Sequence, residues 1–189
     1  GADQVIELRG ARAAFREAPQ ALVRVRDTDA AELASNANVA VVWRRAPGPS
    51  APGTFAHQFP GTLVLEGGTG NRVTAGVGSD LADGVLNVLC VLGLVGEADL
   101  PFHWAGLRRP LLVTDDDVHR VRAERSGLFL PEGESWSRVA AGDSLGTIVD
   151  PLTGDQRADV LAPVDGHVLA IRELPVVFPG TMVARVVKG

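Results

Sequence analysis

One carboxylate in this chain stands where it can do chemistry. Glu66 follows the apolar run Thr62–Leu65 and precedes the glycine-rich segment Gly67–Gly70. An uninterrupted run of apolar and β-branched residues is typical of a buried strand, and open α/β sheets bind ligands at the ends of such strands. A carboxylate at that place can act as a general base toward a substrate, usually beside a metal ion. The alternative is structural, with Glu66 capping the glycine turn by accepting backbone N–H hydrogen bonds.

Alternating strands and helices are expected around Glu66. The strands are expected at residues 3–9, 21–26, 39–43 and 62–65, with a short polar-alanine segment over 11–18 that Pro19 closes. The helices are expected at residues 30–38, capped by Asp27, Thr28 and Asp29, and from Ser79 to Gly93. Apolar residues of the second helix recur at spacings of three and four, which makes one apolar face. This alternation predicts an α/β layer with a largely parallel sheet.

The pattern changes near residue 107. From Leu111 onward, short apolar runs alternate with Gly, Pro and Asp turns, and no helical periodicity is present. We therefore expect an α/β domain over residues 1–106 and an all-β module over residues 107–189. The three carboxylates of residues 115–117 point in different directions on any backbone, so we interpret them as a turn and not as a metal site.

Charge and composition exclude several classes of partner. The formal net charge of −5 and a pI near 5.3 give no basic surface for nucleic acid or for anionic membranes. The longest apolar stretch, residues 85–95, is broken by Asn87 and Gly93 and is too short to span a bilayer. The single cysteine, Cys90, allows no internal disulfide and is expected to be a buried packing residue. These features predict a cytoplasmic protein.

Glycine and Asp-Gly turns recur through the second half of the chain. They occur in Gly142-Asp143-Ser144-Leu145-Gly146, in Ala162-Pro163-Val164-Asp165-Gly166 and in Phe178-Pro179-Gly180. Each such turn permits a tight reversal between short strands that pack face to face. The pattern resembles a barrel-sandwich hybrid of the lipoyl and biotinyl kind. Carriers of those cofactors present a lysine at a hairpin tip, whereas the only lysine here is Lys188, next to the last residue.

The first half carries a likeness to a known enzyme family. The segment Thr62-Leu63-Val64-Leu65-Glu66-Gly67-Gly68, the spaced residues Gly84, Asn87, Leu89 and Gly93, and the strand of residues 2–9 resemble segments of the succinylglutamate desuccinylase/aspartoacylase family. The chain is similar to the C-terminal two-thirds of that family. The resemblance implies a partial α/β layer like that of zinc carboxypeptidases, followed by an all-β barrel-sandwich hybrid module. It also implies hydrolysis of the amide bond of an N-acyl amino acid.

The same resemblance implies roles for two residues. In the family, zinc held by two histidines and a glutamate activates a water molecule, and a downstream glutamate moves protons. Glu66 stands at that glutamate position, which implies a general base that then acts as an acid toward the leaving amine. Arg9 stands at the position of the third zinc ligand, a histidine, and an arginine has no lone pair for a metal. Zinc is therefore implied by the resemblance, but its ligands are not present in this chain.

Arg9 and His57 are the candidate substrate contacts. A guanidinium at position 9 can pair with Glu66 or clamp a substrate carboxylate with two hydrogen bonds. His57 precedes Glu66 by nine residues and is expected near the mouth of the cleft. The other three histidines show no pair at metal spacing and are expected to be surface or packing residues.

Three functions stay open at the level of sequence. The first is an amidohydrolase chain that acts with an N-terminal polypeptide or a homologous subunit, which supplies the zinc ligands and docks on the edge strand near residue 3. The second is a metal-free pseudoenzyme or regulatory binding subunit, which the arginine at position 9 favours. The third is an inactive fragment.

Overall fold

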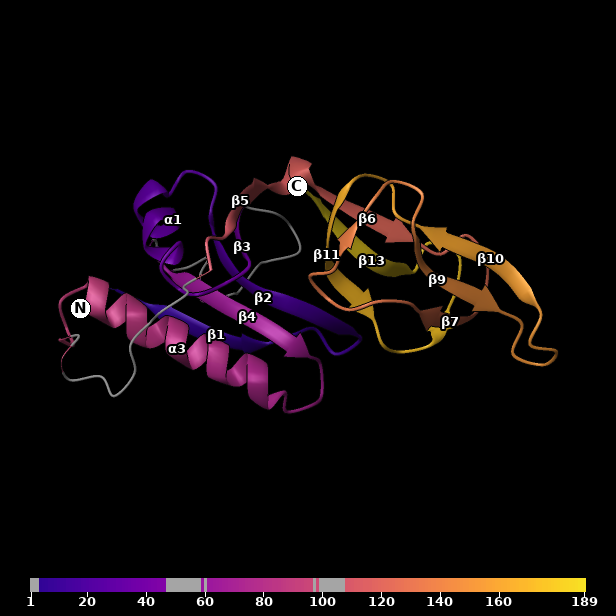
Figure 1. Ribbon diagram of the computed structural model, residues 1–189, viewed down its shortest axis with the longest axis horizontal. Helices are drawn as coiled ribbons and strands as arrows, with labels where there is room; N and C mark the ends of the chain where they lie inside the picture. The colour runs from indigo at the N-terminus through magenta and orange to yellow at the C-terminus, as the bar shows by residue number, and fades with distance from the viewer. Residues whose placement is uncertain (1–3, 47–58, 60, 97, 99–107) are drawn as a thin grey trace. The chain divides into compact units, whose positions relative to one another are not determined.

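The computed structural model describes residues 4–46, 59, 61–96, 98 and 108–189 (Figure 1). Contacts divide the chain into two compact units, each drawn from separate stretches of sequence. Unit 1 comprises Gly1–Gly10, Pro19–Gly68 and Arg72–Asp115, and unit 2 comprises Ala11–Ala18, Thr69–Asn71 and Asp116–Gly189. A single boundary does not describe this division, and the boundary expected near residue 107 lies outside the described residues.

Five described strands form the sheet of unit 1. In sheet order they are β1 (Ile6–Gly10), β4 (Leu63–Thr69), β2 (Phe15–Arg24), β3 (Val41–Arg45) and β5 (Leu111–Thr114). β1 runs parallel to β4, and β3 runs parallel to both β2 and β5. These pairs confirm the parallel sheet that the sequence predicted. β5 was expected in the all-β module, but it completes this sheet beside β3.

Two α-helices, α1 (Thr28–Ala34) and α3 (Ala75–Val91), pack on one face of that sheet (Figure 1). The predicted cap of α1 is confirmed, because the Asp27 carboxylate accepts a hydrogen bond from the Ala30 amide at 3.0 Å. α3 begins at Ala75, a turn before the predicted start at Ser79. Its first turn contains two glycines, whose cost to helix stability is only about 1 kcal/mol each and does not stop a helix that packs on a sheet.

β2 begins earlier than the sequence predicted. Residues 11–18 were expected to form a short polar-alanine segment closed by Pro19, with a strand from Ala21, but Phe15 already belongs to β2. The first residues of this strand pair antiparallel with β11 (Gly166–Arg172), with Glu17 opposite Ala170. Because β11 lies far along the chain from β2, no local sequence pattern predicts this pairing.

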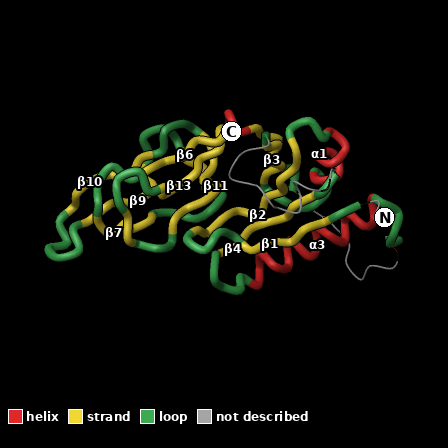
Figure 2. The backbone as a smooth tube through the Cα atoms, turned by 180° about the vertical axis from the view of Figure 1, so that it is seen from behind, coloured by secondary structure: helices red, strands yellow, loops and turns green. Residues whose placement is uncertain are grey.

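Apart from the 3-10 turn at Asp115–Asp117, the part of unit 2 that the structure describes contains only strands and turns, which agrees with the all-β pattern of the second half. Its larger sheet joins the start of β2 to β11, β13 (Met182–Lys188), β6 (Val118–Arg122) and the short β8 (Arg138–Val139). Its second sheet is antiparallel in the order β10 (Gln156–Leu161), β9 (Ser144–Val149), β7 (Gly127–Pro131) and β12 (Val176–Val177) (Figure 2). Phe129, Ile148, Ile171 and Val186 belong to the core of this unit.

The acidic run Asp115–Asp117 forms a short 3-10 helix, η2, which agrees with its interpretation as a turn. The Asp115 carboxylate accepts a hydrogen bond from the Ala46 amide at 3.0 Å and lies 3.5 Å from the Arg45 guanidinium. No helix in the described residues combines the length and apolar character that a bilayer crossing demands.

Candidate functional site

Glu66 lies inside β4, and the expectation that the strand ends at this residue is wrong. β4 continues through Gly67 and Gly68 to Thr69, with Glu66 paired in register with Arg9 of β1. A Cβ atom on Gly67 would lie 3.0 Å from the Cα of Pro19, so glycine here permits a close approach of backbones within the strand. Because β4 does not turn at Glu66, there is no turn at this position for the carboxylate to cap.

The polar residues around Glu66 share one face of the sheet. Side chains alternate along a strand, and residues paired in parallel register point to the same side. Leu63 and Leu65 of β4 pack in the core with the helices, so Glu66 faces the opposite side. Arg9 is in register with Glu66, so it lies on the same side of the sheet. Glu7 lies on that side too, because it is two residues from Arg9 along β1.

Glu66 is a buried carboxylate with a side-chain hydrogen-bond donor. It is 6% exposed, and the amide Nε2 of Gln20 donates to its Oε1 at 3.1 Å. Gln20 is itself fully buried on β2. A buried carboxylate is costly unless it accepts hydrogen bonds, so the amide of Gln20 both stabilises and orients Glu66.

Arg9 is bound by Glu7, a residue that the sequence analysis did not single out. Its Nε and Nη2 donate to the two carboxylate oxygens of Glu7 at 2.6 and 2.8 Å, which is a bidentate pair. The hydrogen bond to Glu7 raises the pKa of Arg9 against the lowering effect of burial, and the negative charges of Glu7 and Glu66 raise it further. The arginine therefore stays charged, with one edge of its guanidinium bound to Glu7.

Glu7 and Gln20 are the partners that sequence reasoning missed. An acidic residue two positions before an arginine on a strand is the signal that points to Glu7, because both side chains then project to one face. Gln20 carried a weaker signal. It is a polar residue directly before the apolar alternation of residues 21–26, and its role depends on the pairing of β2 with β4.

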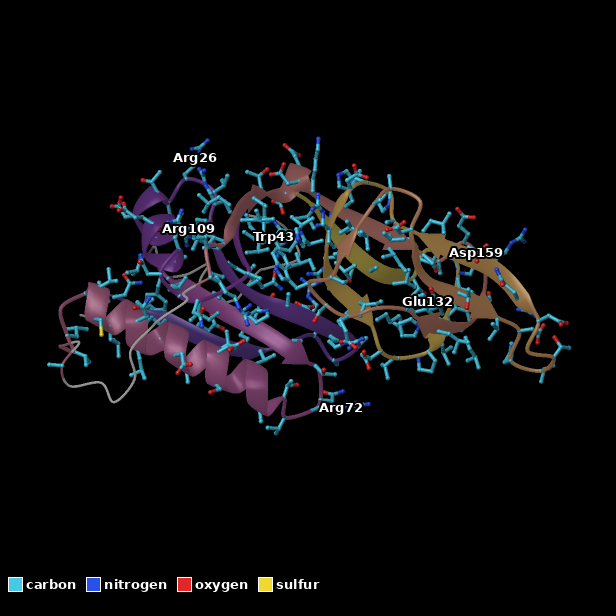
Figure 3. All side chains as sticks on the ribbon, viewed as in Figure 1. Arg26, Trp43, Arg72, Arg109, Glu132 and Asp159 are labelled. Atoms are coloured by element: carbon cyan, nitrogen blue, oxygen red, sulfur yellow. The ribbon has the colours of Figure 1, made fainter. Side chains whose placement is uncertain are left out.

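An aromatic side chain lies further along the same face. Leu22 of β2 is in register with Trp43 of β3, and Leu22 shares its face with Gln20. Trp43, which is labelled in Figure 3, is 1% exposed. The Arg45 guanidinium lies 4.6 Å from its ring centroid. This face of unit 1 is thus charged at β1 and β4 and aromatic at β3.

The described residues do not fit a zinc ion at Glu66. They contain no group of three or more His, Cys, Asp or Glu side chains arranged to hold a metal. At the register position beside Glu66, Arg9 only donates hydrogen bonds. His57 lies outside the described residues, so its expected place near the cleft stays a prediction. Cys90, on α3, is partly exposed, so the expectation of a buried cysteine is wrong.

Comparison with known proteins establishes the fold. No family model matches the sequence, and no curated protein matches it. The apo structure of the ectoine utilization protein EutE (DoeB) from Ruegeria pomeroyi is similar, with a TM-score of 0.78 and 20% identity, over 100% of this chain and 61% of that chain. The crystal structure of a succinylglutamate desuccinylase/aspartoacylase from Rhodobacter sphaeroides has a TM-score of 0.77 and 22% sequence identity, over 99% of this chain and 58% of that chain. The crystal structure of an aspartoacylase family protein from Mesorhizobium loti has a TM-score of 0.74 and 24% sequence identity, over 98% of this chain and 63% of that chain.

The chain spans about six tenths of the length of these solved proteins. Sequence identity at this level supports a shared architecture, and function must then be argued from the site itself. The broad, sheet-dominated fold that the resemblance of residues 2–9 and 62–93 implied is confirmed. The chain has the fold of the succinylglutamate desuccinylase/aspartoacylase structures.

Proposed function

We propose that the chain belongs to the succinylglutamate desuccinylase/aspartoacylase family and takes part in the hydrolysis of N-acyl amino acids. The observation that carries the proposal is Glu66, a buried carboxylate oriented by the amide of Gln20 on a sheet of this fold. We also propose that unit 2 is a barrel-sandwich hybrid and that the protein acts in the cytoplasm. The Asp-Gly turns and the single cysteine support these two points.

Glu66 is assigned the proton transfers of the reaction. As water attacks the amide carbonyl, the carboxylate takes one of its protons, and it then gives that proton to the nitrogen of the leaving amine. The C–N bond breaks, and the products are a carboxylic acid and a free amino acid. The hydrogen bond from Gln20 supports this role, because it fixes the direction of the carboxylate while adding no charge of its own.

Arg9 and His57 are assigned to the substrate. Glu7 binds the Nε and Nη2 edge of the Arg9 guanidinium, which leaves Nη1 and the second Nη2 proton for a substrate carboxylate. His57 is proposed as a second contact on the strength of its place nine residues before Glu66. Replacement of Arg9 by Ala should then weaken the binding of N-acyl amino acids, which calorimetry measures.

Zinc is implied by the fold family, and the donor set of this chain does not hold it alone. We therefore assign the zinc ligands to polypeptide outside this chain, either an N-terminal polypeptide or a homologous subunit. β1 supports this arrangement, because among the described strands it pairs with β4 alone and lies at the edge of the sheet. An edge strand presents unpaired backbone groups to an incoming chain.

Hydrolysis assays on the Glu66→Gln variant test the proposal. The chain is purified alone and after co-expression with neighbouring gene products, and release of free amino acid from N-acetyl and N-succinyl substrates is measured. Loss of a positioned acid–base group should lower kcat about 10²- to 10⁴-fold. Glu32→Gln, on α1, is the matched control and should keep full activity. Full activity in Glu66→Gln would refute the assignment.

A second candidate is a metal-free binding subunit, which the Arg9–Glu7 pair favours. A guanidinium bound to a carboxylate at this position supplies positive charge beside Glu66 without a metal ion. Metal analysis of the purified complex separates the two candidates. Stoichiometric zinc together with turnover supports the hydrolase, whereas metal-free protein that binds N-acyl amino acids without turnover supports the binding subunit.

A further inference from the structure

Unit 2 contains a hollow that lies outside the candidate site of unit 1. Its volume is about 460 Å³, and it is lined by Glu124, Arg125, Ser126, Arg157 and Pro179. The lining comes from the connection between β6 and β7, from the start of β10 and from the turn that precedes β13. A volume of this size is in the range of small-molecule sites.

Backbone hydrogen bonds join two walls of the hollow, the connection after β6 and the turn before β13. The Ala123 amide donates to the carbonyl of Thr181 at 2.8 Å, and the Gly180 amide donates to the carbonyl of Ala123 at 2.8 Å. Nη1 of Arg122 donates to the carbonyl of Gly180 at 2.6 Å. The connection after β6 and the turn before β13 therefore form one fixed surface, and a ligand does not have to order them.

Arg157 is held in place on the third wall. Its Nη1 donates to the carbonyl of Ser126 at 3.0 Å, and its Nη2 pairs with the carboxylate of Asp150. Asp150 in turn accepts the Leu152 amide at 2.8 Å. This backbone hydrogen bond and then the Arg157 guanidinium hold the pKa of Asp150 below its ordinary value, so the ion pair persists near neutral pH. Arg157 is thus oriented before any ligand arrives.

Arg125 differs from Arg157 in having no such partner. Its side chain is exposed, and it makes no hydrogen bond or ion pair with any residue that the structure describes. The lining holds two guanidinium groups, and Asp150 neutralises that of Arg157. Arg125 is therefore the guanidinium of the lining that has no ion-pair partner among the described residues. An exposed guanidinium without an ion-pair partner attracts anions to its surroundings.

We propose that this hollow binds the oxyanion of a small acidic molecule, either a carboxylate or a phosphate group. Arg125 supplies the unpaired charge, and the anchored Arg157 supplies a second guanidinium, a group suited to planar or tetrahedral oxyanions. Pro179 gives the hollow an apolar wall, and the neighbouring Phe178 is 63% exposed, which suits a ligand with a carbon body. Glu124 opposes the anion and limits its affinity.

The test is an NMR titration of the full chain with inorganic phosphate and, in a second arm, with succinate, at constant ionic strength. Amide shifts should concentrate at Ser126, Arg157 and Gly180, and the tighter-binding probe identifies the oxyanion. Arg125→Ala should weaken binding about tenfold or more, the loss of one charge-assisted hydrogen bond. Glu124→Gln should strengthen binding several-fold, because it removes a repulsive charge. A variant that merely disturbs the fold would not strengthen the binding of the anion.

Arg138→Ala is the matched control, because Arg138 is also an exposed arginine of unit 2 but does not line the hollow. It should leave the affinity unchanged. The proposal is overturned if Arg125→Ala binds phosphate and succinate as tightly as the parent chain, or if Arg138→Ala weakens binding equally. Shifts spread over the whole surface of the chain would also overturn it.

Discussion

Two buried glutamates, one in each unit, are held in different ways. Glu66 of unit 1 accepts a hydrogen bond from the neutral amide of Gln20. Glu17 of unit 2 lies 3.5 Å from the guanidinium of Arg185, and each of these two side chains is at most 1% exposed. Arg185 also lies 5.9 Å from the ring centroid of Phe15, so its charge is enclosed on the aromatic side as well.

The difference is between a carboxylate held in a buried ion pair and one that accepts a hydrogen bond from a neutral amide. A buried ion pair commits both charges to the core, because loss of either partner leaves the other without compensation in a medium of low dielectric constant. An amide donor fixes the direction of a carboxylate without adding charge at the contact. The charge nearest in register to Glu66, on Arg9, is itself paired with Glu7. Glu17 therefore belongs to the packing of unit 2, whereas the amide-bound Glu66 is the carboxylate to which we assigned proton transfer.

The largest expected effect comes from breaking the buried pair. Arg185→Met should lower the free energy of unfolding by about 3–5 kcal/mol, because it leaves the Glu17 charge buried. Glu66→Gln should lower it by no more than about 1 kcal/mol, because an amide fills the same space and keeps a hydrogen bond. Urea denaturation followed by circular dichroism measures both.

A double variant provides the control for that comparison. Glu17→Leu combined with Arg185→Met removes both charges, and its stability should recover toward that of the parent chain. If Arg185→Met cost less than Glu66→Gln, the distinction between the two glutamates would be wrong.

A smaller effect tests the packing of α3 in unit 1, the unit that contains Glu66. A Cβ atom on Gly84 of α3 would lie 2.0 Å from the carbonyl oxygen of Ala37, so Gly84→Ala must move the helix. We expect a loss of about 1–3 kcal/mol in the free energy of unfolding, as for an overpacked core. Gly78→Ala, in the same helix, meets nothing within 4 Å and should gain up to about 1 kcal/mol. Equal effects from the two variants would contradict this packing.

The smallest expected effect is a pH dependence in unit 2. The ring of His167 stacks on Trp136 with centroids 4.6 Å apart. Burial, and secondarily the charge of Arg138, lower the pKa of His167 from its ordinary value of 6.5. The unfolded chain therefore takes up this proton at higher pH than the folded chain does. The contribution of His167 to the free energy of unfolding is therefore fully present above pH 6.5, the ordinary pKa of histidine. It is lost as the pH falls from there toward the lowered pKa of His167 in the folded chain.

Urea midpoints measured between about pH 7.5 and 5.5 check this effect, because that range brackets the ordinary titration of histidine. His167→Gln should show a shallower decline of stability on acidification than the parent chain. Identical pH profiles for the two proteins would show that His167 does not contribute.

The sequence predicted the features of this fold that depend on neighbouring residues. The cap of Asp27 on α1 and the apolar face of α3 follow from spacings of three and four residues, and both are present. The all-β character of the second half follows from recurring turns. Each of these patterns involves only residues close together in the chain.

The features that the sequence did not predict depend on distant partners. Phe15 begins a strand because β11 pairs with it, and Glu66 lies inside a strand because Gly67 passes close to Pro19. The glycines after Glu66 were interpreted as a turn, since glycine serves turns and close backbone approaches alike. For the same reason, Gln20 became visible as a partner of Glu66 only once the strand order was known.

The pairing of Glu17 with Arg185 also sets the order of events during synthesis. The two residues are 168 positions apart, so the glutamate leaves the ribosome long before its arginine is made. The start of β2 lacks its hydrogen-bonding neighbour until β11 emerges, and Glu17 lacks its counter-charge until β13 emerges. Closure of so long a loop is slow compared with local folding. Unit 2 is therefore completed only after β13 has left the ribosome, and a nascent chain halted before β13 would present Glu17 without Arg185 to chaperones and proteases.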